Sequence, residues 1–207
     1  CYEEAYPKCT LLMGSCVMLP DNELASLQMF NEWQYYYPMT DDLNIAYEQG
    51  GVGIGDVSEG LRSDLWKLQY ISGELYLGKA DETLVSVLSI GAGIVKVALA
   101  FDQNMRPVYA WQLNPVDCVL RFYDTTLSGY SQVTFEDIES PCLTLDDSRP
   151  ESSTTTDVIF AYLKAGVLYY RQQRDRYLIE YTLTETDKKH LVRVGLSLGN
   201  RLQFMLK

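Results

Sequence analysis

The residue types that could carry out catalysis are few in this sequence and poorly spaced for it. Its one histidine, His190, follows two lysines and has no nucleophile motif beside it, so we expect a surface or strand-edge residue. Two aspartate pairs, Asp41-Asp42 and Asp146-Asp147, suggest the paired carboxylates of a glycosidase. Adjacent residues of a strand point to opposite faces, so neither pair alone supplies two converging carboxylates. We therefore expect no enzyme activity.

Metal and cofactor sites are not indicated either. The five cysteines are Cys1, Cys9, Cys16, Cys118 and Cys142. The first three are not spaced as zinc-binding pairs, and one histidine adds no second pair. The cysteines fit buried free thiols, which the sequence favours, or a local disulfide within residues 1–16. No aspartate-rich calcium loop is present, and we expect no cofactor.

Residues 166–181, GVLYYRQQRDRYLIEY, combine tyrosines with Arg171, Arg174 and Arg176, as a nucleic-acid surface does. The formal net charge of −11 argues against such binding. Charge is also uneven, because residues 1–60 carry ten acids and one base, whereas residues 166–207 carry eight bases and four acids. This asymmetry suits head-to-tail contact between unlike surfaces of neighbouring subunits or of different proteins, or a solvated face at each end. On the first interpretation the contacts involve the three arginines on one side and Asp41 and Asp42 on the other.

An internal repeat organises most of the chain. Residues 64–90 align without a gap to residues 157–183, with Gly73 over Gly166. A middle copy covers residues 107–135, and a partial copy closes the chain at 192–207. Alternating apolar and polar residues predict strand, turn, strand, longer turn and strand in each copy. After the turn at QRDR, one strand face is predicted to carry Tyr177, Ile179, Tyr181 and Leu183.

These patterns predict an all-β fold. The repeated antiparallel β-domain spans residues 64–207, in units of about 47 residues at 64–92, 93–139, 140–186 and, in part, 187–207. It is expected to form a β-propeller-like, incomplete ring or a sandwich of stacked sheets. The acidic, loop-rich segment 1–63, with a helix start in 20–33, is an arm that packs on a neighbour or a closing element of the repeat.

One apolar run, residues 84–101, imitates a membrane span in length. Lys96 lies within it, and Gly91 and Gly93 interrupt it. Two strands joined through a Gly-Ala-Gly turn explain the run better, so no membrane contact is expected.

Aromatic residues offer an alternative function. Exposed rings can stack on sugars, and the candidates are Trp33, Tyr35, Tyr36 and Tyr37, together with Trp66 and Trp111. This pattern fits a glycan-binding β-propeller, either a host-recognition module or a secreted or lipid-anchored lectin. Strand aromatics are more often core or inter-subunit residues, and that interpretation stays open beside the first.

Residues 143–183 contain, in order, a Leu-Asp-Asp-x-Arg turn, a Ser/Thr loop, DVIFAY and LYYRQQRDR. This block resembles a recurring segment of virion structural proteins of tailed bacteriophages, and residues 97–111 are similar to the segment upstream of it. The resemblance covers about residues 93–207 and is most specific from Tyr169 to Arg176. It implies a virion component of the tail, tail tip or baseplate. Its partners would be other virion proteins, in a symmetric homo- or hetero-oligomer, with a host-surface glycan as a further candidate.

Overall fold

The computed structural model describes residues 43–49, 65–113, 116–146, 156–187, 190–196 and 202–206. Within these residues the predicted all-β fold class is confirmed. The strands form antiparallel sheets, and the one helical element among them is a short 3-10 turn, η4 (Gln173–Asp175). No described residue belongs to a helix that is long and apolar enough to cross a membrane.

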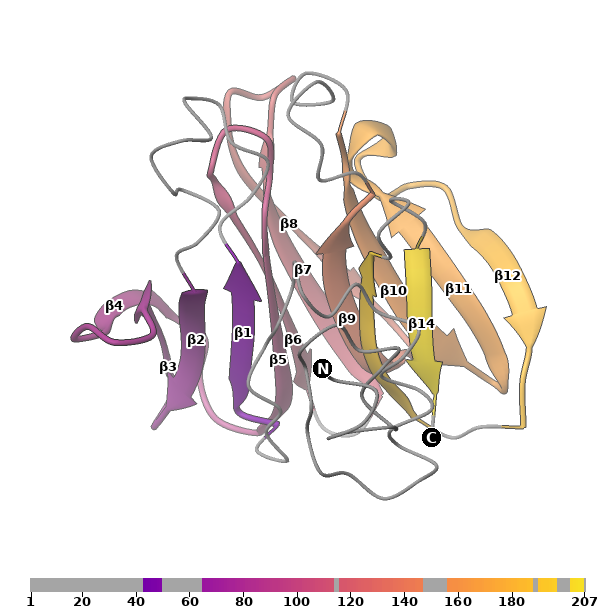
Figure 1. Ribbon diagram of the computed structural model, residues 1–207, viewed down its shortest axis with the longest axis horizontal. Helices are drawn as coiled ribbons and strands as arrows, with labels where there is room; N and C mark the ends of the chain where they lie inside the picture. Colours follow the sequence, from indigo (N-terminus) through magenta and orange to yellow (C-terminus); the bar gives the residue numbers. More distant parts are fainter. Residues whose placement is uncertain are drawn as a thin grey trace, which may run out of the picture.

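Three four-stranded sheets follow one another along the chain, and each is a simple meander (Figure 1). The first contains β1 (Ile45–Gln49), β2 (Leu65–Ile71), β3 (Glu74–Lys79) and β4 (Val85–Ser89). The second contains β5 (Ile94–Phe101), β6 (Pro107–Leu113), β7 (Asp117–Asp124) and β8 (Gly129–Phe135). The third contains β9 (Glu139–Leu145), β10 (Val158–Lys164), β11 (Val167–Gln172) and β12 (Tyr181–Glu185). A two-stranded sheet of β13 (Leu191–Leu196) and β14 (Leu202–Leu206) follows.

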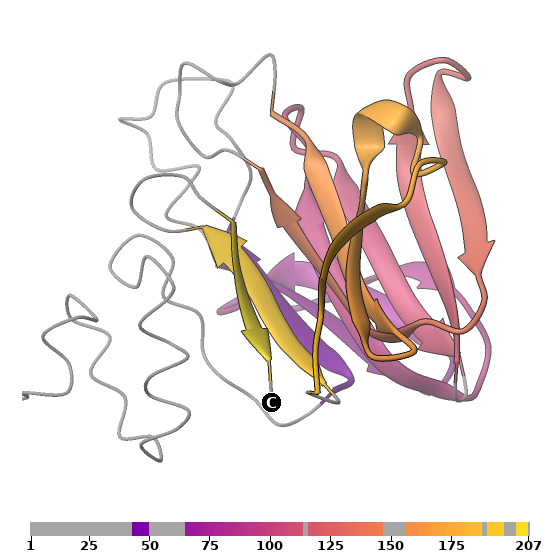
Figure 2. The ribbon, with the colours of Figure 1, turned by 90° about the vertical axis from the view of Figure 1, so that its right-hand side faces the viewer.

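The first strands of the four sheets are neighbours in space. β1 contacts β5, β5 contacts β9, and β9 contacts β13. From this row the remaining strands extend outward, so that β4 and β12 lie at opposite ends of the long axis in Figure 1. Figure 2 shows the third sheet standing between the second sheet and the yellow β13–β14 pair, face against face.

Sheets stacked in this way need strands that are apolar on both sides, and β5 and β10 have that composition. In β5, Val97, Leu99 and Phe101 belong to the core shared with the first sheet. Ala98 and Ala100 belong to the core shared with the third sheet. The outermost strands β4 and β12 are mostly exposed, because nothing among the described residues covers them.

The hairpin turns repeat from the first sheet to the third. Between β2 and β3, Ser72 and Gly73 have φ values of 49° and 96°. Between β10 and β11, Ala165 and Gly166 have φ values of 51° and 77°. Two consecutive positive φ angles define the type I′ turn, whose twist matches that of paired strands. A glycine at the second position therefore accounts for the alignment of Gly73 with Gly166.

Two sequence expectations are refined by these strands, and a third is not tested by them. Residues 45–49, which we expected to lie outside the repeat, form β1 and pair with β2. The Gly-Ala-Gly turn does join two strands, but β4 and β5 belong to different sheets. The helix start expected in residues 20–33 lies outside the described residues.

The expected strand from Tyr177 onward is wrong. β12 begins at Tyr181, and Tyr177 is fully buried whereas Ile179 is half exposed. The physical reason is the turn that follows η4, which takes Tyr177 out of the alternating pattern and into the core.

Candidate functional site

The stretch in which the resemblance is most specific, from Tyr169 to Arg176, runs from β11 into a compact turn at one end of the third sheet. We call residues 171–178 the arginine turn. Gln172 is still extended, η4 follows, and the Arg176 N–H closes the turn on the Gln173 carbonyl at 2.7 Å. Arg176 and Tyr177 have φ values of 53° and 58°. Residues other than glycine adopt this left-handed conformation at a cost in free energy of roughly 1 kcal/mol or more. Contacts of the side chains must therefore stabilise the turn.

Arg171 holds the inside of the turn. Its Nη1 donates to the carbonyls of Tyr177 at 2.9 Å and Leu178 at 3.1 Å. Its Nη2 donates to Glu180 at 2.9 Å, and its Nε donates to the Tyr162 hydroxyl at 2.8 Å. The Tyr162 hydroxyl in turn donates to Glu180. Arg171 therefore fixes both backbone and side chains with one planar group, which a lysine cannot do.

This network shifts the titration of its acid. Burial acts to raise the pKa of Glu180, but hydrogen bonds from Tyr162 and Arg171 outweigh it, and the pKa lies below its ordinary value. The pKa of Tyr162 is raised, first by burial and then by its hydrogen bond to Glu180. Both groups therefore keep their neutral-pH charge states, a tyrosine hydroxyl and a carboxylate.

Arg174 ties the turn to the connection between β9 and β10. Its Nε lies 2.7 Å from Asp157, and its Nη2 lies 2.7 Å from Asp146. The backbone N–H of Arg174 also donates to the Asp157 carboxylate at 3.0 Å. Burial raises the pKa of Asp157, and the bonds from Arg174 offset this only in part. The pKa of Asp157 therefore lies above its ordinary value, so this carboxylate is protonated more readily than a free aspartate.

Gln173 and Arg176 reach across to the second sheet. The Gln173 amide donates to the Tyr123 carbonyl at 3.3 Å, and Arg176 Nε donates to Asp124 at 2.7 Å. The Asp124 side chain is only 1% exposed. Burial acts to raise its pKa, but hydrogen bonds from the Thr126 N–H and from Arg176 outweigh this, and the pKa is lowered. The hydrogen bond from Arg176 therefore helps to keep the buried Asp124 side chain in its charged form.

Tyr177 completes the link between the two sheets. Its ring is fully buried and meets Phe122 of β7 edge-on at 4.9 Å and Phe160 of β10 at 6.4 Å. Its hydroxyl has no hydrogen-bond partner among the described residues. Burial raises its pKa well above the ordinary value. The ring fills apolar space between the two sheets. The arginine turn, which we also call the clasp, therefore connects the third sheet to the second through Gln173, Arg176 and Tyr177.

An aspartate makes the same kind of contact after the first strand of the second sheet and after the first strand of the third sheet. Asp102 follows β5 and accepts the backbone N–H of Arg106, the residue before β6, at 2.9 Å. Asp146 follows β9 and accepts the backbone N–H of Asp157, the residue before β10, at 2.7 Å. In the second and third sheets one aspartate thus closes the first connection. Their position directly after an apolar strand is the signal by which the sequence could have indicated them.

The predicted site residues are distributed unevenly. The structure brings Arg171, Arg174 and Arg176 together and gives each a carboxylate partner within the chain. Their contact with a neighbouring subunit stays a prediction. The residues that lie outside the described part are Asp41, Asp42, Trp33, Tyr35, Tyr36 and Tyr37.

Two further tryptophans were considered for sugar stacking. Trp111 is 3% exposed and is a core residue, so the core interpretation holds for it. Trp66 is partly buried and packs its ring against Phe101 at 5.3 Å. Sugar stacking by Trp66 stays a prediction.

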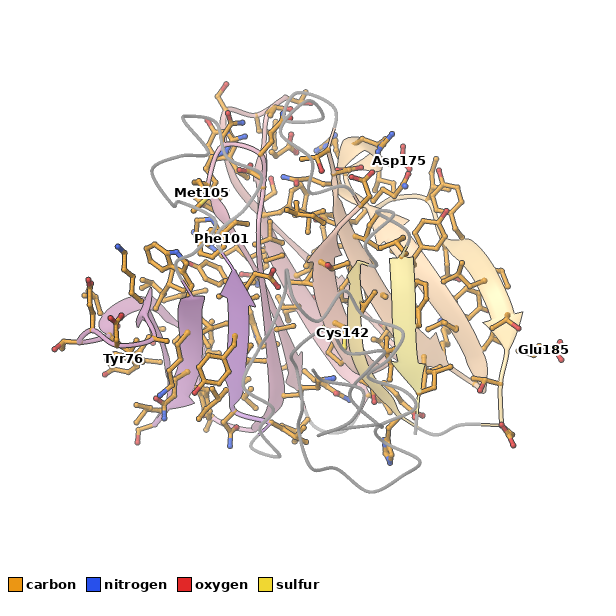
Figure 3. All side chains as sticks on the ribbon, viewed as in Figure 1. Tyr76, Phe101, Met105, Cys142, Asp175 and Glu185 are labelled. Atoms are coloured by element: carbon orange, nitrogen blue, oxygen red, sulfur yellow. The ribbon has the colours of Figure 1, made fainter. Side chains whose placement is uncertain are left out.

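Other candidates for chemistry are also placed. His190 is exposed next to β13, as predicted. Cys118 and Cys142 are both buried, and burial raises the pKa of Cys118. Cys142, marked at the centre of Figure 3, receives a hydrogen bond from Lys96 at 3.4 Å. Within the described ranges, no three His, Cys, Asp or Glu side chains gather as a metal-binding set.

Comparison with known proteins gives no family assignment: no protein-family model, no curated protein and no solved structure matches the chain significantly.

Proposed function

We propose that this chain is a structural component of a bacteriophage virion, placed in the tail, tail tip or baseplate. It acts there through protein–protein contacts rather than by catalysing a reaction. The observation that carries the proposal is the resemblance of residues 93–207 to virion structural proteins, which is most specific from Tyr169 to Arg176. Residues 171–176 of this stretch also belong to the arginine turn, so part of the resemblance falls on an element with a defined structural task.

The proposed architecture is an incomplete β-propeller. In such a ring each blade is a four-stranded meander and the blades are repeated radially. The meander order within each sheet and the neighbouring first strands β1, β5, β9 and β13 support it. The proposed blades are the units 64–92, 93–139, 140–186 and the partial unit 187–207, with β1 added to the first.

The proposed inter-subunit contact falls on the outer side of the clasp. The Arg174 and Arg176 side chains are 53% and 45% exposed, whereas Arg171 is 15% exposed. Each of the first two has a free flank that an acidic neighbour can approach, with Asp41 and Asp42 of the next subunit as the proposed partners. Arg171 serves the fold and adds little to such a contact.

Quantitative proteomics of purified phage particles tests the assignment. We expect the chain at a fixed stoichiometry, in a multiple that matches a symmetric tail component. Labelling with an antibody against the chain should mark the tail in electron micrographs. Absence from particles would overturn the proposal, and binding of the purified chain to host-surface glycans would then favour the lectin alternative.

The arginine contact needs a control, because Arg174 also supports the fold. Arg174→Gln removes the charge, whereas the double variant Asp146→Asn/Asp157→Asn removes both internal carboxylate partners and keeps the arginine. We expect Arg174→Gln to reduce incorporation into particles more than the double variant does. The deficit should shrink at raised salt, because screening weakens the exposed charge contact in the unaltered chain as well. Equal losses from the two variants would show that only folding was affected.

A further inference from the structure

The last sheet is half the size of the other three. β13 and β14 form a two-stranded sheet, whereas each preceding sheet has four strands. The far edge of β14 has no partner strand among the described residues. A free edge presents a row of unpaired N–H and C=O groups and is a template for another strand.

The two-stranded sheet covers only part of the face of the third sheet on which it stacks. In Figures 1 and 2 the β13–β14 pair stacks on this sheet, with β11 and β12 beyond β14. Leu168 and Tyr170 of β11 belong to the core shared with β13–β14. Tyr170 stacks on Tyr181 of β12 at 4.9 Å, and both tyrosines are only partly buried. They form an aromatic ledge, defined here as Tyr170 and Tyr181.

The second sheet shows what a complete cover does. The residues of its third strand that face the neighbouring sheet are Cys118, Leu120 and Phe122, with exposed fractions of 0%, 0% and 2%. In the third sheet the corresponding face is buried at Leu168, at 2%, but not at Tyr170. The neighbouring sheet has four strands in the first case and two in the second.

We propose that part of the acidic segment 1–42 pairs with the β14 edge of its own chain and covers the aromatic ledge. This inference rests on the propeller arrangement proposed above and supplies the missing outer half of its fourth blade. The occupant is a stretch of this chain, so that stretch is an internal closing element, whereas Asp41 and Asp42 at the end of the segment remain the proposed contact with the next subunit.

Charge favours this occupant. Residues 1–42 contain seven acids and one base, whereas residues 187–207 contain five bases and one acid. The two segments are therefore of opposite charge, and such complementarity favours their association.

Length and attachment favour it too. Two strands of the usual five to six residues and a turn need about 15–20 residues, which 42 residues supply. The described chain begins at Leu43, whose carbonyl accepts the Val97 N–H of β5 at 2.9 Å. The segment is thus tethered to the row of first strands to which β13 also belongs.

Hydrogen exchange in the full-length chain is the first test. In an edge strand alternate amides point away from the sheet and exchange quickly, whereas in an inner strand all amides are protected. We expect the amides of residues 202–206 to exchange slowly at every position, unlike the alternating pattern of an edge such as β4. Alternating fast and slow exchange in β14 would overturn the proposal.

Zero-length coupling of carboxylates to amines identifies the occupant. We expect links from acids of residues 1–42 to Lys188, Lys189 or Lys207, and few to the matched lysines Lys67, Lys79 and Lys164. A mixture of isotope-labelled and unlabelled chain separates links within one copy from links between copies. Links confined to the control lysines, or found only between copies, would overturn the proposal. The purified chain suffices for both tests, so their failure is distinct from absence of the chain from phage particles.

Discussion

The Nε atom of Arg176 lies 2.7 Å from Oδ2 of Asp124, although 52 residues separate them in the chain. The pair joins the arginine turn of the third sheet to the end of β7 in the second sheet. Because the Asp124 side chain is 1% exposed, its charge is compensated by Arg176 and by nearby backbone N–H groups rather than by water. A basic motif that suggested a binding surface is therefore, within this chain, a connection between sheets.

Arg171 should be irreplaceable by lysine. Arg171→Lys keeps the charge but loses the planar group that bonds the Tyr162 hydroxyl, two carbonyls and Glu180. We expect the free energy of unfolding to fall by about 2 kcal/mol, since hydrogen bonds to charged groups contribute roughly this much. Urea unfolding monitored by tryptophan fluorescence measures it.

Arg121→Lys is the matched control for that variant. The Arg121 guanidinium lies over the Tyr130 ring at 5.0 Å. Loss of an exposed cation–π contact changes stability by less than about 1 kcal/mol. Equal effects of the two lysine variants would contradict the role given to Arg171.

Two buried tyrosine hydroxyls should respond with opposite signs. Tyr162→Phe removes the group that bonds both Glu180 and Arg171, and should cost about 1–3 kcal/mol of unfolding free energy. Tyr177→Phe removes a buried hydroxyl that has no partner among the described residues. It should leave stability unchanged or raise it by about 1 kcal/mol. Thermal unfolding of the two variants compares them directly, and a clear loss in Tyr177→Phe would reveal a partner of that hydroxyl.

The clasp should weaken in acid. The pKa of Glu180 lies below its ordinary value of 4.5, and that of Asp124 lies below 3.8. A lowered pKa in the folded state gives stability that is complete above the ordinary value and is lost as pH falls through the folded value. We therefore expect the free energy of unfolding to decline below about pH 4.5, and the decline to be shallower in Glu180→Gln.

Asp157 should have the opposite effect. Burial raises its pKa, so protonation of this carboxyl favours the folded state and its contribution grows as pH falls. Asp157→Asn should make the acid decline steeper than in the unaltered chain. Urea titrations from about pH 7 to about pH 3 cover the window. Identical pH profiles of Asp157→Asn and Glu180→Gln would contradict these assignments.

The sequence was sufficient for the all-β class and for many strand positions because alternation and paired glycines are local signals. The alignment of Gly73 with Gly166 identified two turns that share one geometry. The burial of Tyr177 could not be predicted from these local signals. Its period-2 spacing to Tyr181 fits a strand, and only the contacts with Phe122 and Phe160 make the turn conformation favourable.

Long-range pairing explains why the site was predicted only in part. The arginines are evident in the sequence, but their partners Asp124, Asp146 and Asp157 come from two other connections of the fold. In Figure 3, Asp175 marks the end of the third sheet where these connections meet. Nothing in the spacing of acids along the chain indicates that Asp124 meets the arginine turn, because that contact depends on how two sheets stack.

The two repeated hairpins offer a last test, this time of a local rule. Ala165 and Ser72 occupy the first position of type I′ turns with φ near 50°. Asparagine tolerates this left-handed region better than alanine or serine does. We expect Ala165→Asn and Ser72→Asn each to raise the free energy of unfolding by about 0.5–1 kcal/mol.

Gly166→Ala should lower the free energy of unfolding by about 1–2 kcal/mol, because a side chain at φ 77° is strained and its Cβ would meet the Thr186 carbonyl oxygen at 3.4 Å. Chemical denaturation of the three variants measures these shifts, and a stabilising Gly166→Ala would show that the turn differs from the one described.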